Sequence, residues 1–192
     1  MAELEYTTIA ISDIGTQLFH FNTTSLKFEY AMPITAGGDF SGDQESFEVP
    51  ETDLPYIPKI GGRRSLNDIE YTANYTAEKY KRATEITSAT ESQTYMEVLN
   101  DGSAMIFNGT CAMPGIVAGD TRQISLTIIP ESETWVDNIY DINSDILSTL
   151  DSNWYDTDSS TSKKYIKIDT TTIPSARQDY FAVENRPSTI DG

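Results

Sequence analysis

The most informative part of the sequence is residues 95–132, which read YMEVLNDGSAMIFNGTCAMPGIVAGDTRQISLTIIPES. Asn100-Asp101-Gly102 separates two runs of β-forming residues, and this arrangement is typical of a tight hairpin. Further along, apolar residues at 124, 126 and 128 alternate with polar residues at 123, 125 and 127. That alternation predicts a strand with one buried face. Pro130 lacks a backbone N–H, so we expect this strand to end there.

The region before this stretch predicts a further strand followed by a helix. Residues 69–75 place Ile, Tyr, Ala and Tyr at alternate positions, with polar residues between them. Thr76 is a suitable N-cap for a helix that begins at residue 77. Tyr80, Ala83 and Ile86 recur at the spacing of one helical face.

The N-terminal third combines strands with an unusually long connection. We expect strands at residues 7–12, at residues 17–21 and around residues 26–30. Residues 33–66 then form a long loop or an extended hairpin, with scattered prolines, glycine pairs and aromatic residues. A connection of this length is usually functional or disordered. The apolar side chains interleaved in this segment indicate that it packs against another surface of the protein or of a partner.

The C-terminal region changes its periodicity. Apolar residues in 131–151 follow a three- and four-residue spacing, which predicts an amphipathic helix. Residues 152–162 are polar and acidic, and a short strand is expected at 164–168. The sequence therefore predicts a mainly β domain at 1–132, including the loop 33–66, and a C-terminal extension at 133–192 that carries a helix and a polar tail.

Composition restricts the functional classes. The 192 residues contain 13 Lys and Arg against 30 Asp and Glu, for a net charge of −17. A chain with this charge is a poor candidate for binding nucleic-acid phosphates or an anionic membrane. No apolar run approaches the length of a membrane span, and the N-terminus does not resemble a signal peptide, so we expect synthesis in a cytoplasm. The charge fits either simple solubility or a surface past which a polyanion moves without sticking.

Few residues could support catalysis or bind a metal. The chain has one His and one Cys, too few for a structural zinc site. We interpret His20, within the run LFHF, as a structural strand residue, and Cys111 as a buried thiol. Asp156-Thr157-Asp158 resembles the opening of a calcium loop but lacks its later glycine and glutamate, which favours a solvated acidic loop. We therefore predict no enzyme activity, no catalytic residue, no metal and no cofactor.

Taken in order, these elements resemble the major tail-tube proteins of long-tailed, siphovirus-type bacteriophages. The resemblance covers roughly residues 5–132, from TTIAISDIGTQLFHF through SLNDIEYTANYT to the stretch quoted first. It implies a sandwich-like or barrel-like β core with one flanking helix. It also implies a structural subunit that assembles as hexameric rings, which stack into the conduit for viral DNA delivery. The tube protein of type VI secretion shares this fold.

The resemblance also assigns surfaces, partners and location. The polar faces Thr72/Asn74/Thr76 and Gln123/Ser125/Thr127 would line the lumen, where DNA passes without specific binding. The segment 36–64 would make contacts between subunits or between stacked rings through Tyr56, Ile57, Ile60, Arg63 and Arg64. The partners would be further copies and other tail proteins, and the location would be the virion tail, without a membrane. The alternative is a β-sandwich surface module that binds a carbohydrate or a host receptor.

Overall fold

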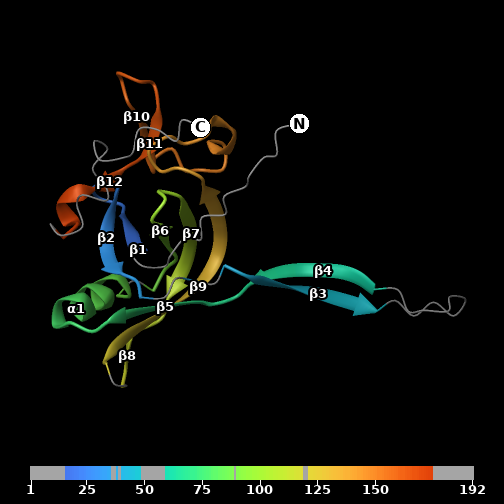
Figure 1. Ribbon diagram of the computed structural model, residues 1–192. Helices are drawn as coiled ribbons and strands as arrows, with labels where there is room; N and C mark the ends of the chain where they lie inside the picture. Colours follow the sequence, from blue (N-terminus) through green and yellow to red (C-terminus); the bar gives the residue numbers. More distant parts are fainter. Residues whose placement is uncertain are drawn as a thin grey trace, which may run out of the picture.

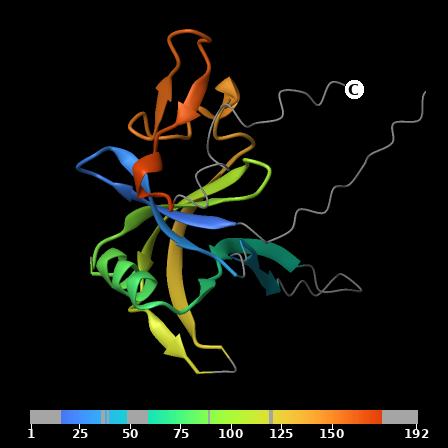
Figure 2. The same ribbon diagram turned by 60° about the vertical axis from the view of Figure 1, so that its left-hand side comes forward.

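The computed structural model describes residues 16–35, 38, 40–48, 59–88, 90–118 and 121–174. These residues form a mainly β structure, as predicted, built on one strongly curled sheet (Figures 1 and 2). The strand predicted at residues 7–12 lies outside the described residues.

The main sheet has eight strands in the order β12-β2-β1-β6-β7-β9-β5, with β8 paired to β9. All neighbours are antiparallel except β12 and β2, which run parallel. The strands are β1 (Gln17–Asn22), β2 (Lys27–Pro33), β5 (Ile69–Asn74), β6 (Gln93–Val98), β7 (Ala104–Cys111), β8 (Gly115–Val117), β9 (Gln123–Val136) and β12 (Ile168–Asp169). The hairpin predicted at Asn100-Asp101-Gly102 joins β6 to β7 and is confirmed.

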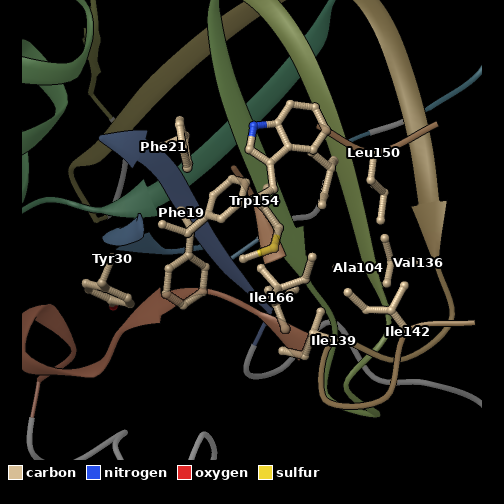
Figure 3. Packing of buried hydrophobic residues seen from close by; sticks show 14 of the residues in the cluster. Phe19, Phe21, Tyr30, Ala104, Val136, Ile139, Ile142, Leu150, Trp154 and Ile166 are labelled. Atoms are coloured by element: carbon tan, nitrogen blue, oxygen red, sulfur yellow. The ribbon is translucent and has the colours of Figure 1, made fainter. Parts of the chain in front are cut away.

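Alternate residues of each strand point to opposite sides of the sheet, and the central strands β1, β6 and β7 are largely buried on both faces. One face builds a helix-side core, which includes the buried side chains of Leu18, Met32, Tyr71, Ala83, Tyr95, Phe107, Ile124, Leu126 and Ile128. The other builds a C-terminal-side core (Figure 3), which includes Phe19, Phe28, Met96, Ile106, Val136, Ile139, Ile142, Leu150, Trp154, Ile166 and Ile173. Both cores rest on the same central strands.

The helix predicted from Thr76 is confirmed as α1 (Ala77–Ile86). The Thr76 side chain accepts a hydrogen bond from the backbone N–H of Lys79, which satisfies one of the free donors of the first turn. Ala83 is the buried residue of the helix, and it seats α1 on the helix-side core.

The predicted C-terminal helix over residues 131–151 is wrong. Strand β9 continues to Val136, and residues 137–154 follow as turns around a short 3-10 helix, η1 (Ser144–Ile146). The apolar side chains that predicted a helical face instead come from successive turns and pack on the sheet. They include Ile139, Ile142 and Leu150. Tertiary packing, and not helical periodicity, sets their spacing.

The expected end of β9 at Pro130 is also wrong. The strand passes through Pro130 because the β7–β9 register shifts there: Gly109 lies opposite Pro130, whereas Asn108 lies opposite Ser132. A β-bulge tolerates proline, since the regular ladder is already interrupted at that point. The described pairing of β9 with β5 also ends at Ile128, so Pro130 interrupts no bond to that strand.

The remaining elements are small. Strands β3 (Gly42–Glu48) and β4 (Lys59–Leu66) pair with each other, which confirms an extended hairpin within the predicted long connection. Strands β10 (Tyr155–Thr157) and β11 (Lys164–Ile166) form a second hairpin, and η2 (Thr170–Thr172) follows β12. Strand β11 confirms most of the strand predicted at 164–168. Strand β9 crosses the domain boundary predicted at residue 132, and the division into 1–132 and 133–192 stays a prediction.

Candidate functional site

The two polar rows proposed for a lumen meet on one face of the β5–β9 pair. Thr72 lies opposite Ser125, Asn74 opposite Gln123 and Glu70 opposite Thr127. The other face of the same strands carries Tyr71, Ala73, Ile124, Leu126 and Ile128, all within the helix-side core. The alternation in the sequence therefore sorts the side chains as expected, and the polar row stays at least partly accessible to solvent.

Thr76 does not belong to this row. It follows the end of β5, and its hydroxyl is used as the N-cap of α1. Thr72 is tied locally as well: its carbonyl oxygen accepts hydrogen bonds from the backbone N–H and the hydroxyl of Thr35. The geometry thus brings together five of the six predicted residues.

The polar face extends further across the sheet than the sequence alone indicated. Thr110 lies opposite Ile129, and Asn108 lies opposite both Thr94 and Ser132. The Thr94 hydroxyl donates to the Asn108 side-chain oxygen at 2.7 Å, and the Asn108 amide donates to the Ser132 hydroxyl at 3.2 Å. Alternation within residues 104–111 could have placed Asn108 and Thr110 outward. Their alignment with β9, however, depends on the β-bulge in the β7–β9 pairing, and no sequence pattern predicts that bulge. We call the surface formed by Thr72, Asn74, Thr94, Asn108, Thr110, Gln123, Ser125 and Thr127 the hydroxyl–amide face.

The β3–β4 hairpin carries three of the residues assigned to contacts between subunits. Ile60, Arg63 and Arg64 lie in β4; Ile60 pairs with Phe47 and Arg64 with Gln44, across a register shift. Tyr56 and Ile57 lie outside the described residues. Figure 1 shows the hairpin projecting away from the main sheet, with both strands paired only to each other among the described strands. An isolated two-stranded ribbon is marginally stable in water, so such a projection gains from a partner surface.

A buried carboxylate lies at the base of this hairpin. Glu97 is 3% exposed, and its Oε2 accepts a hydrogen bond from the Tyr71 hydroxyl at 2.8 Å. The same oxygen accepts the backbone N–H of Gly38, in the segment that leads into β3. Burial and the adjacent Glu97 charge hold the pKa of Tyr71 well above its usual value, so its proton remains available to donate. Sequence reasoning missed this site, because Glu97 stands in the run YMEV as an ordinary alternating polar residue.

Replacing Tyr71 with phenylalanine is expected to lower the free energy of unfolding by about 1.5–3 kcal/mol. The change removes one donor from a carboxylate that the protein cannot return to water. Equilibrium urea unfolding measures the loss, and hydrogen exchange should accelerate at the Gly38 amide. Tyr80→Phe, on the half-buried face of α1, is the matched control and should cost less than about 0.5 kcal/mol. Equal effects of the two changes would contradict a special role for the Tyr71–Glu97 bond.

The single histidine and the single cysteine have structural surroundings, as predicted. The His20 ring lies 2.6 Å from the Gln93 side-chain oxygen and tilts against Tyr95, and burial lowers the His20 pKa. Cys111 is buried, and its thiol donates to the Thr127 carbonyl oxygen. Burial raises the pKa of the Cys111 thiol to about 11, so the nucleophilic thiolate is scarce at neutral pH.

The acidic loop at residues 156–161 is organised by its own hydrogen bonds. The Asp158 carboxylate accepts from the Ser160 N–H, the Ser160 hydroxyl and the Thr161 hydroxyl, and these bonds lower its pKa to about 2. This supports the solvated acidic loop. Within the described ranges, no group of three or more His, Cys, Asp or Glu side chains is placed to hold a metal ion. Nor does any helix in that part of the chain have the length and apolarity to cross a membrane.

Comparison with known proteins gives a result at the level of the fold. No protein-family model matches the sequence, and no curated protein matches it significantly. Among solved structures, a chain of the six-fold symmetrised baseplate of the anti-feeding prophage superposes with a TM-score of 0.55 at 7% identity, covering 68% of this chain and 97% of that one. A chain of the cap that terminates the tube of the anti-feeding prophage gives 0.53 at 12% identity, covering 71% and 95%.

A third structure, the sheath–tube complex of an extracellular contractile injection system in its extended state, gives a TM-score of 0.51 at 10% identity. It covers 68% of this chain and 94% of its counterpart. Nearly the whole of each neighbour is therefore matched, whereas about a third of this chain has no counterpart in it. The chain has the tail-tube fold shared by components of these phage-related injection systems.

Proposed function

We propose that this chain is the structural subunit of a tail tube of the siphovirus type, stacked as hexameric rings that form the conduit for viral DNA. It assembles with further copies and with other tail proteins in the virion, and it has no catalytic role. The observation that carries the proposal is the tail-tube fold, found in three structures of tube, cap and baseplate assemblies, one of them six-fold symmetrised.

The hydroxyl–amide face is the lining of the proposed conduit. None of its side chains is cationic, and Glu70 adds a carboxylate beside Thr127. DNA is held through Lys and Arg on its phosphates. A neutral or acidic lining in a chain of net charge −17 would therefore let the polyanion slide instead of retaining it.

The β3–β4 hairpin supports the assembly part of the proposal. It leaves the main sheet as a ribbon, and the buried Glu97 carboxylate accepts a hydrogen bond from the Gly38 N–H in the segment that leads into it. In the proposed ring, the hairpin packs on a neighbouring copy through Ile60, Arg63 and Arg64, together with Tyr56 and Ile57. Ring closure requires a heterologous contact of this type, in which two different surfaces meet.

Negative-stain electron microscopy of the purified protein, at low and high concentration, tests the proposal. Hollow rings or tubes of uniform width are the expected result. A monomer that persists at high concentration would instead favour the β-sandwich module that binds a carbohydrate or a receptor.

The lining is tested on the assembled tubes by cysteine protection. Ser125→Cys places a thiol on the hydroxyl–amide face, and Ser160→Cys places a matched thiol on the exposed β10–β11 turn. Both should react with a small maleimide, but only the Ser160 variant should react in tubes with a maleimide attached to a large polymer. Equal polymer labelling would remove the lumen assignment while leaving the tube function intact.

A further inference from the structure

The segment between β7 and β9 forms an uncharged apolar finger. Residues 112–118 contain β8, and three of their side chains are conspicuously exposed: Met113 at 84%, Ile116 at 50% and Val117 at 50%. None of these seven residues carries a charge, in a chain where 22% of residues do. In both ribbon views β8 extends beyond the end of the main sheet (Figures 1 and 2).

A second exposed apolar side chain lies at the other end of the same long strand. The finger pairs with the first residues of β9, where Val117 lies opposite Gln123, whereas Trp135 is next to the last residue of β9 and 45% exposed. An extended strand rises about 3.3 Å per residue, so the two positions lie at most about 40 Å apart along the curved strand. The finger and Trp135 therefore lie at opposite ends of β9 and cannot meet within one copy.

The charges around the two ends allow the two surfaces to approach each other. In the sequence, Asp120 and Arg122 both follow the finger and offset each other in charge, and Arg122 is exposed at its base. Glu133 and Asp137 are exposed on either side of Trp135, whose indole N–H donates to the Asp137 carboxylate at 2.7 Å. Two copies of net charge −17 repel each other over most of their surfaces. An apolar finger whose flanking Asp120 and Arg122 cancel in charge can approach an acidic rim around a tryptophan without that penalty.

We propose that the finger of one copy docks on the Trp135 end of β9 in the next copy along the tube axis. This inference rests on the proposed tube function and specifies which surfaces join successive rings. Met113, Ile116 and Val117 cover Trp135, and Arg122 pairs with Glu133 and Asp137. Because the two surfaces differ and lie at opposite ends, each docked copy presents a new free finger, and the contact propagates as an open stack.

The first test is the double variant Ile116→Asp/Val117→Asp. It should still form rings, because the sheet and the β3–β4 hairpin are unchanged, but tube length in electron micrographs should fall to single rings or short stacks. Leu26→Asp is the matched control: it also places a carboxylate on an exposed apolar residue, 40% exposed in the β1–β2 turn, and should leave tube length unchanged. Tubes of normal length from the double variant would overturn the proposal.

Cross-linking provides a second test that does not depend on the folding of the double variant. Ala118→Cys places a thiol beside Val117, and Glu133→Cys places one on the Trp135 side of β9, both in full-length protein with native Cys111 buried. Mixed under mild oxidation, the two variants should form covalent dimers of one copy of each. Each variant alone should remain monomeric on a non-reducing gel.

The outcomes separate this proposal from the proposed function. Homodimers of the Ala118 variant alone, or an absence of mixed dimers in preparations that contain tubes, would overturn the finger contact while the tube function stands. An absence of rings and tubes in the unmodified protein would instead count against the tube function itself.

Discussion

Replacing Trp154 with alanine is expected to lower the free energy of unfolding by about 3–5 kcal/mol, as for other buried aromatic side chains. Trp154 is 9% exposed, and its ring lies 6.4 Å from that of Phe28 in a tilted, edge-on arrangement. Figure 3 shows the indole between the phenylalanines of β1 and Leu150. Truncation would open a cavity between the C-terminal segment and the sheet. Equilibrium urea unfolding, followed by tryptophan-independent circular dichroism, measures the effect.

Tyr165→Ala is the matched control in the same segment. Tyr165 lies in β11 and is 37% exposed, so its removal should change stability by less than about 1 kcal/mol. If both variants were mild, residues 137–174 would be a loosely attached appendage and not one side of a core. A second, earlier unfolding transition confined to the Trp154 variant would lead to the same conclusion.

Gly109→Ala is the second change with a large expected effect, a loss of about 3 kcal/mol, the upper end of the usual cost of overpacking. A Cβ at this position would lie 2.5 Å from the carbonyl oxygen of Ile129 and 2.9 Å from the Ile128 side chain. The first of these atoms is backbone in the partner strand, so relief requires β7 and β9 to move apart at the bulge. Thermal unfolding should show a clear fall in Tm, with a smaller yield of rings as a secondary readout.

Gly115→Ala is the matched comparison, because it also lies opposite β9. The nearest atom to its added Cβ would be the Ser125 Cβ at 4.0 Å, an ordinary contact. This variant should unfold within about 0.5 kcal/mol of the parent protein. A Gly109 variant as stable as the Gly115 variant would mean that the bulge can relax without cost.

The sequence was most informative where alternation and turn chemistry act locally. Residues 69–74 and 123–128 alternate cleanly, and they pair with each other in the register that buries one face of each. The helix start at Thr76 followed from a capping rule that needs only three residues. These features depend on neighbours in the chain, which the sequence displays directly.

The failures share a dependence on distant contacts. The apolar spacing after residue 131 suggested a helix, but Ile139, Ile142 and Leu150 are placed by the sheet below them. Pro130 was expected to end β9, and only the register shift opposite Gly109 explains its position within the strand. The buried Glu97 and the extension of the hydroxyl–amide face to Thr94 likewise require the pairing of β6, β7 and β9 to be known.

The two-sided burial of the sheet has a consequence for the order in which the newly made chain can fold. Strands β1, β2, β6, β7 and β9 are complete once residue 136 has been synthesised, but the partners of Phe19, Phe28, Met96 and Ile106 arrive only with residues 139–173. Until then a nascent chain carries a broad apolar surface open to water, where it can bind chaperones or aggregate with other nascent chains. Synthesis of residues 139–173 therefore times the covering of this surface.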